Sequence, residues 1–142
     1  TQIMVAAGEK LPFTQRQIEF KGHAIECRVN AEDPYKFTPS PGRISTWHAP
    51  GGPGVRVDTH VYNNYFVPPN YDSMIGKIIT YGDTREQAMA RMRTALLETV
   101  VEGIKTNIPL HQDLMVDSKF MEGGTNIHYL EEWLTHRTPS KR

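Results

Sequence analysis

The 142-residue sequence has a single cysteine, no apolar run as long as a membrane span, and no excess of either charge. Cys27 cannot form an intramolecular disulfide, which favours a reducing compartment. No signal-peptide pattern opens the chain, and no stretch reaches the roughly 20 apolar residues of a spanning helix. The 16 basic residues balance 16 acidic ones, whereas nucleic-acid and membrane binders usually carry a basic excess. We expect a soluble cytoplasmic protein that binds neither nucleic acid nor membrane.

Common catalytic and metal-binding motifs are also missing. HExxH, HxxxH and CxxC do not occur, so we expect no zinc site. There is no Gly-x-Ser-x-Gly elbow, and one cysteine among scattered histidines is weak support for a nucleophile. The glycine-rich stretch 49–54 lacks the Lys-Ser or Lys-Thr pair of a phosphate-binding loop and precedes an alternating segment, so it predicts a turn. Hydrolytic chemistry is therefore not supported.

The length suits one domain with a real core, and extended segments dominate its first half. Residues 17–30 predict a strand that bends at Gly22. Residues 43–48 and 55–62, joined by the Gly and Pro turn, predict a hairpin. Residues 73–81 predict a mostly buried strand. Strands that precede helices indicate an α+β domain with an antiparallel sheet.

The clearest predicted helix occupies residues 82–103. Thr84 and Gln87 match a capping box, with Asp83 and Glu86 as an alternative register. An apolar stripe recurs at helical spacing and predicts a buried face, formed by Met89, Met92, Leu96 and Val100.

Shorter helices are predicted near both ends of the chain. The opening residues give a partial helical face that Gly8 ends. Residues 108–116 predict a helix capped by Asn107, and residues 127–134 predict the last helix. We read the opening as the end of a longer helix, which suggests a fragment or a processed piece.

The segment GHAIECRVNAEDP, residues 22–34, alternates between an apolar and a polar side. Glu26 and Arg28 share the polar side, while Cys27 lies on the apolar side as a small buried hydrophobe. Two interpretations of Arg28 stay open at this point. Glu26 and Arg28 form a solvated surface pair, or the permanently charged guanidinium binds a carboxylate, a bicarbonate or a developing oxyanion.

Residues 122–130, EGGTNIHYL, permit a second pair of interpretations. Two glycines allow the backbone to approach a ligand, and Thr125 or Asn126 can begin a helix whose N-terminus favours negative charge. The segment therefore predicts either a simple helix cap or a nucleotide contact.

Several longer motifs occur in order along the chain: GHAIECRVNAEDP, TPSPGRI, HAPGGPGVRVD, YDSMIGKIITYG, GIKTN and GGTNIHYLE. Together they resemble the C-terminal domain of biotin carboxylase, over about residues 2–134. The resemblance implies an α+β fold, mainly antiparallel sheet with flanking helices. It also implies an ATP-dependent ligase of the ATP-grasp superfamily, which uses ATP and bicarbonate to carboxylate N1 of biotin on a biotin carboxyl carrier protein.

The same resemblance implies roles for individual residues. Arg28, in the ECR motif, would hold the ureido oxygen of biotin as enolate character develops. Asp72, in the YDS motif, would lie near the biotin site and orient Arg28. Ile127 would contact the adenine of ATP, although its pattern without the resemblance assigns it to the core. The family's magnesium ligands, ATP-binding lysines and glutamate base would belong to segments before this chain.

A homodimer is also implied. Arg56 and Glu98 match a pair that bridges the two subunits of bacterial-type homodimers. Pro53 departs from the family form, because an aromatic residue often adds to that interface at this position.

The resemblance also divides the chain and places it in a pathway. Residues 1–12 would end a helix of the preceding ATP-grasp region, residues 13–136 would form the domain, and residues 137–142 would be a flexible tail. The setting would be acetyl-CoA carboxylase in fatty acid synthesis, with carboxyltransferase subunits as partners, and this chain by itself would be inactive. The alternatives are a non-catalytic dimerisation or carrier-docking module and the biotin carboxylase part of a pyruvate or acyl-CoA carboxylase.

Overall fold

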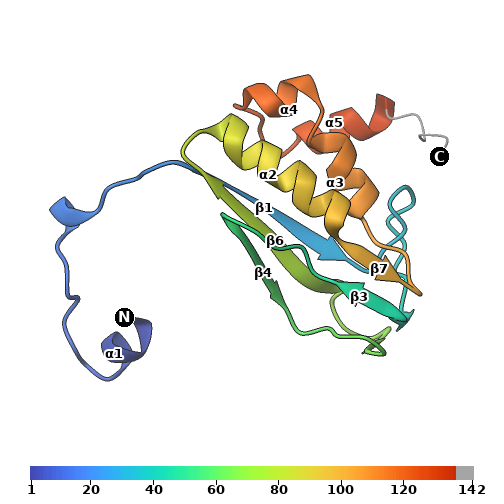
Figure 1. Ribbon diagram of the computed structural model, residues 1–142, viewed down its shortest axis with the longest axis horizontal. Coiled ribbons are helices and arrows are strands. Elements are labelled where there is room, and N and C mark those ends of the chain that lie inside the picture. Colours follow the sequence, from blue (N-terminus) through green and yellow to red (C-terminus); the bar gives the residue numbers. More distant parts are fainter. Residues whose placement is uncertain (137–142) are drawn as a thin grey trace.

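The computed structural model describes residues 1–136 and shows the predicted α+β fold with antiparallel sheets. The predicted flexible tail, residues 137–142, lies outside the described residues. The main sheet has the strand order β1–β6–β4, and its strands are β1 His23–Asn30, β4 Val55–Thr59 and β6 Met74–Gly82. Figure 1 shows these three strands side by side, with helices lying across one face.

The predicted hairpin of residues 43–48 and 55–62 is wrong. The first segment is split between two small sheets, because Ile44 is buried and its N–H donates to Tyr65 while the next N–H donates to Glu102. The strands of these two sheets pair as β2 Gly42–Arg43 with β5 Phe66–Val67, and β3 Thr46–His48 with β7 Val100–Glu102. Strand β4 pairs with β6 instead.

The strand predicted for residues 17–30 begins only at His23. A short 3₁₀ turn occupies Gln15–Gln17, and Phe20 is fully exposed. Gly22 has a φ of +69°, and a Cβ there would lie 2.5 Å from the Gly82 carbonyl oxygen. The chain thus turns sharply into the sheet at residue 22 and has no partner strand before it.

Helix α2, Arg85–Glu98, begins at the predicted cap. The Thr84 hydroxyl accepts from the Gln87 N–H at 3.3 Å, while the Gln87 side chain accepts from the Asp83 N–H at 2.7 Å. The predicted stripe is buried at Met89, Met92 and Leu96. Val100 is not part of the stripe, because the backbone becomes extended at Thr99. Val100 begins β7 and pairs there with His48 of β3.

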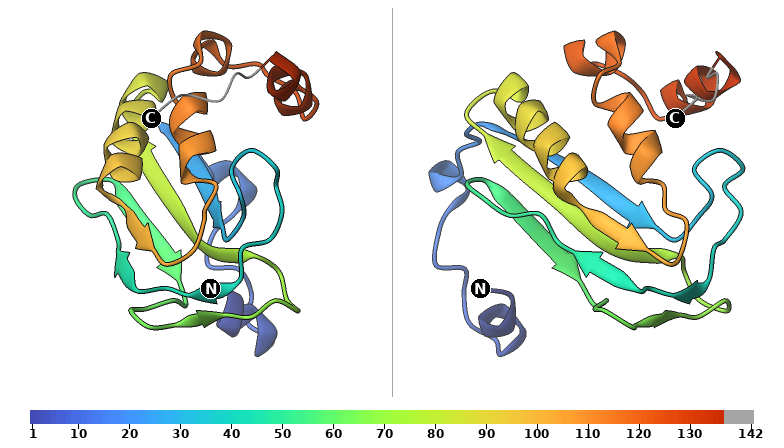
Figure 2. Two further views of the ribbon diagram at one scale, coloured as in Figure 1. Left: turned by 90° about the vertical axis from the view of Figure 1, so that its right-hand side faces the viewer. Right: turned by 45° about the vertical axis from the view of Figure 1, so that its right-hand side comes forward.

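Three further helices follow: α3 Ile108–Leu114, α4 Ser118–Glu122 and α5 Tyr129–His136. Helix α4 was not predicted, and α5 begins two residues later than predicted. Helices α2 and α3 pack on the same side of the main sheet (Figure 2). The core lies between these helices and the sheet. It is filled by apolar side chains with little or no exposure, including Ile25, Cys27, Val29, Ile75, Ile78 and Leu110. Among residues 1–136, no helix is long and apolar enough to cross a membrane.

The first 22 residues form an arm that extends away from this body (Figure 1). It begins with α1, Gln2–Ala6, and the predicted end at Gly8 is confirmed by a φ of +91°. All of its residues are exposed.

Candidate functional site

Arg28 lies on the face of the main sheet that the helices leave open. Its neighbours Cys27 and Val29 are buried beneath α2 and α3, so the alternation of β1 turns Arg28 and Glu26 the other way. The Arg28 side chain is 65% exposed, and its Nε donates to the Glu26 carboxylate at 3.2 Å. The predicted surface pair is confirmed, and the guanidinium retains donors for a ligand.

A row of charged residues crosses this open face. Lys77 of β6 stands directly opposite Arg28 of β1 and also opposite Asp58 of β4. Asp58 accepts two hydrogen bonds from Arg56, at 2.9 and 2.8 Å, and this pair holds the pKa of Asp58 below its usual value. Two cations directly opposite each other repel, so Arg28 and Lys77 together favour an anion above the strands. The sequence predicts a mostly buried strand over residues 73–81 and does not show that Lys77 stands opposite Arg28, because that pairing depends on the register of β6 with β1.

Asp72 lies just before β6, at the end where β6 meets Asn30 of β1. Its carboxylate accepts from the Met74 N–H at 2.8 Å and so caps the start of the strand. The ion pair of Arg28 is with Glu26. The orienting role of Asp72 therefore stays a prediction.

Asn107 begins α3 as predicted, but its side chain does not cap the helix. Its carboxamide accepts from the Asn30 N–H at 2.8 Å and donates to the Arg28 carbonyl at 3.0 Å. His111, one turn further along α3, places Nε2 at 2.8 Å from the same carbonyl. Burial lowers the pKa of His111, and the bond to Arg28 only partly opposes this shift. A cap position gives no signal in the sequence for such long-range contacts.

Ile127 is 88% exposed, so its assignment to the core from the pattern is wrong. It follows Gly123 and Gly124, which have φ values of 87° and 76° and turn the chain between α4 and α5. The Asn126 side chain accepts from the His128 N–H at 2.8 Å and helps to begin the last helix. Helix α5 lies on the helical side of the sheet (Figure 1), whereas Arg28 lies on the open side.

The Asp117 carboxylate joins α4 to α5, the two helices on either side of this glycine loop. Asp117 accepts from the Phe120 N–H at 2.8 Å, from the Tyr129 hydroxyl at 2.5 Å and from the Trp133 indole at 3.0 Å. Desolvation raises the pKa of Asp117, but these hydrogen bonds lower it by more, so the net shift is downward. Arg85 of α2 donates to the Phe120 carbonyl at 2.6 Å and ties α4 to the core.

The two residues of the expected dimer contact come from different elements. Arg56 lies on β4 and is 73% exposed at its side chain, and Glu98 ends α2. Glu98 lies 3.7 Å from His48 and 3.5 Å from the Gly51 N–H. Both side chains are thus held by neighbours within the chain.

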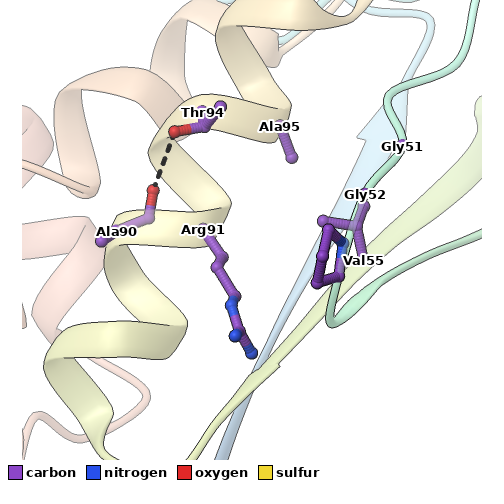
Figure 3. Close-up of a pocket in the computed structure, with 8 residues that line it drawn as sticks. Gly51, Gly52, Val55, Ala90, Arg91, Thr94 and Ala95 are labelled. Atoms are coloured by element: carbon purple, nitrogen blue, oxygen red, sulfur yellow. Dashed lines mark hydrogen bonds between the residues drawn. The ribbon is translucent and has the colours of Figure 1, made fainter.

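A pocket of about 360 Å³ lies between α2 and the loop that carries Pro53. Figure 3 shows Arg91 and Thr94 of α2 on one side of it and Gly52 and Val55 on the other. The lining of this pocket is mostly apolar, because it includes glycine, proline and alanine residues.

No group of three potential metal-ligating side chains occurs within residues 1–136. Cys27 is buried, and burial followed by the charge of Glu26 raises its pKa to about 12. A thiol with so high a pKa stays protonated and is a poor nucleophile.

Comparison with known families decides the relationship. The family model of the biotin carboxylase C-terminal domain matches residues 26–132, which contain the whole main sheet apart from the first residues of β1. The chain belongs to this family. Biotin carboxylase from Haemophilus influenzae is 61% identical over 94% of this chain, and a pyruvate carboxylase subunit from Methanothermobacter thermautotrophicus is 50% identical over 93%.

Solved structures of this family have the same fold. The biotin carboxylase domain dimer of Hydrogenobacter thermophilus 2-oxoglutarate carboxylase, in complex with MgADP, ADP and bicarbonate, matches with a TM-score of 0.89 at 46% identity. It covers 92% of this chain, which covers 29% of it. Rhizobium etli pyruvate carboxylase matches with a TM-score of 0.92 at 27% identity, over 99% of this chain and 15% of its own.

The chain spans about 30% of the length of the curated biotin carboxylases that it matches. Arg28, Asp72 and Asn107 all lie within the matched residues.

Proposed function

We propose that this chain forms the C-terminal part of a biotin carboxylase, an ATP-dependent ligase that carboxylates N1 of biotin on a carrier protein. The supporting observation is Arg28, an exposed guanidinium on a rigid strand of a biotin carboxylase C-terminal domain. The relatives named for bicarbonate and MgADP complexes agree with bicarbonate and ATP as substrates.

In the proposed mechanism, Arg28 donates to the ureido oxygen of biotin. Negative charge develops on that oxygen as N1 becomes nucleophilic, and a guanidinium already in place stabilises the charge without reorganising. The planar guanidinium offers several donors in a fixed fork, which suits a single developing oxyanion. The alternation of β1 places Arg28 on the open face, where its Nε donates to Glu26, and Asp72 would orient the guanidinium once biotin is bound.

Ile127 fits an adenine contact, because an exposed isoleucine beside two glycines offers an apolar surface to a flat ring. Magnesium would neutralise the phosphate charge of ATP when bound. The set of residues that the structure describes supplies no such magnesium site. We assign magnesium and phosphate binding to the preceding ATP-grasp region of the same enzyme.

We further propose a cytoplasmic homodimer in which Arg56 and Glu98 meet the second protomer. One related structure is described as a domain dimer, which supports this assembly. The carrier protein and carboxyltransferase subunits are the other proposed partners, in the acetyl-CoA carboxylase reaction of fatty acid synthesis. Three proteins named biotin carboxylase are 59–61% identical to this chain, which supports the biotin carboxylase part of this setting.

The decisive experiment replaces Arg28 in the complete enzyme. Arg28→Ser should lower kcat for biotin carboxylation by roughly 100- to 1,000-fold, as expected for the loss of a preorganised donor to a developing oxyanion. Arg28→Lys is the matched control, since it keeps the charge but loses the fork, and it should give an intermediate rate. Near-normal turnover by Arg28→Ser, with unchanged folding, would support the non-catalytic dimerisation or docking module instead.

The carboxyl acceptor is tested separately by adding purified carrier and carboxyltransferase subunits to the complete enzyme. The proposal expects carboxylation of acetyl-CoA. Transfer to pyruvate instead would assign the chain to a pyruvate carboxylase, as its similarity to the Methanothermobacter protein allows.

A further inference from the structure

Strand β1 is an edge strand of the main sheet, because the strand order is β1–β6–β4. One backbone edge of β1 pairs with β6, and alternate residues direct their N–H and C=O groups to the other edge. On that other edge, the Arg28 carbonyl and the Asn30 N–H meet α3. The Asn107 carboxamide accepts a hydrogen bond from the Asn30 N–H and donates one to the Arg28 carbonyl, as a peptide group of a neighbouring strand would.

Two further hydrogen bonds strengthen this junction. His111 Nε2 lies 2.8 Å from the Arg28 carbonyl, and the Asn107 N–H donates to the Asn30 carbonyl at 3.2 Å. Asn107 is only 6% exposed, so water does not readily replace its partners. The start of α3 and the outer edge of β1 are therefore joined at the residue that carries the guanidinium.

The junction lies next to an irregularity in the pairing of β1 with β6. The register between β1 and β6 shifts between Val29 and Asn30, so the ladder is irregular directly after Arg28. The Arg28 side chain is 65% exposed, and within residues 1–136 it forms an ion pair with Glu26. Its position thus depends mainly on its own backbone, which α3 holds from the side.

We propose that Asn107 and His111 are positioning residues for Arg28, an inference that rests on the proposed function. They act through the Arg28 carbonyl and do not touch the substrate. The Asn107 amide sets the path of the strand across the register shift, and His111 supplies a second donor to the same oxygen. Neutral imidazole with its proton on Nε2 donates this bond, and the protonated ring donates it as well.

The test uses the complete enzyme with Asn107→Asp, which keeps an acceptor for the Asn30 N–H but loses the donor to Arg28. A displacement of about 1 Å at a reacting group costs up to ~100-fold, so kcat for biotin carboxylation should fall roughly 10- to 100-fold. The KM for ATP should not change. Gln112→Leu is the matched control, because Gln112 on the same helix donates to the Leu96 carbonyl of α2 and not to β1. Its kcat should stay at the wild-type value.

A second series covers the case in which Asn107→Asp does not fold. His111→Leu removes one donor and leaves the Asn107 pair, so it should lower kcat less than Asn107→Asp. His111→Gln offers an amide donor and should recover most of the loss. If both His111 variants, and Asn107→Asp where it folds, match the control in kcat while Arg28→Ser is inactive, the positioning role is wrong and the proposed function stands. If Arg28→Ser is active as well, the proposed function itself fails.

Discussion

The two ends of the described chain have similar compositions but differ in how they are held. Residues 1–22 carry apolar side chains such as Phe13 and Phe20, and every residue of this arm is exposed. Helices α4 and α5 also contain no fully buried residue. Their apolar side chains are nevertheless partly buried against the core, and the hydrogen bonds of Asp117 and Arg85 join them to it. Within residues 1–136, polar anchors therefore accompany the apolar contacts of α4 and α5, whereas the arm packs against no part of the described core.

The largest expected difference comes from removing one aromatic side chain at each end. Trp133→Ala deletes a ring that packs against the core and donates to Asp117, so it should lower the free energy of unfolding by roughly 2–4 kcal/mol. Phe20→Ala removes a fully exposed ring and should change it by less than about 0.5 kcal/mol. Urea denaturation of the 142-residue chain measures both. Equal losses would show that the arm packs as α5 does.

A smaller difference separates two glycines with positive φ. Gly22→Ala should destabilise the chain by roughly 1–3 kcal/mol, because the backbone is strained for alanine and the new Cβ meets the Gly82 carbonyl. Gly8 has a φ of +91°, but a Cβ added there would have no atom within 4 Å, and Gly8 lies in the arm. Thermal unfolding should therefore show a lower Tm for Gly22→Ala only. A matching drop for Gly8→Ala would mean that α1 unfolds together with the body.

The smallest effect concerns pH. The pKa of Asp117 is lowered on folding, so its contribution to stability is present above the ordinary value of 3.8 and is lost as the pH falls through the folded value. Asp117→Asn should flatten the loss of stability between about pH 5 and pH 2, by roughly 1 kcal/mol at most. Denaturation midpoints across this range measure the difference. Parallel pH curves for the wild-type and Asp117→Asn proteins would show that the Asp117 carboxylate does not hold α5 in place.

Local patterns predicted the elements whose buried side chains recur at a regular spacing along one face of the element. The alternation of Ile25, Cys27 and Val29 located β1, and the spacing of Met89 and Met92 located α2. The hairpin failed because β3 pairs with β7, more than 50 residues away, and no turn residue encodes that pairing. Val100 was assigned to the helix for the same reason, since the helical stripe continues through it although the backbone does not.

The candidate site shows the same division. The charged side of β1 was predicted, and its Glu26–Arg28 pair is confirmed. The roles of Arg28, Asp72, Ile127, Arg56 and Glu98 come from the family resemblance and stay predictions. Lys77 and the side-chain contacts of Asn107 were missed, because both depend on which residues stand opposite each other after folding.

Sequence periodicity was enough to establish which side of β1 is apolar, where α2 begins and that the chain has an α+β fold. Residue patterns report the preferences of neighbours along the chain, and side-chain alternation and helix capping are properties of this kind. Only the tertiary structure placed Asn107 and His111 on the Arg28 carbonyl, joined β3 to β7 and left Ile127 exposed. These contacts form between segments far apart in the sequence, so they are decided by how the sheet and helices pack together.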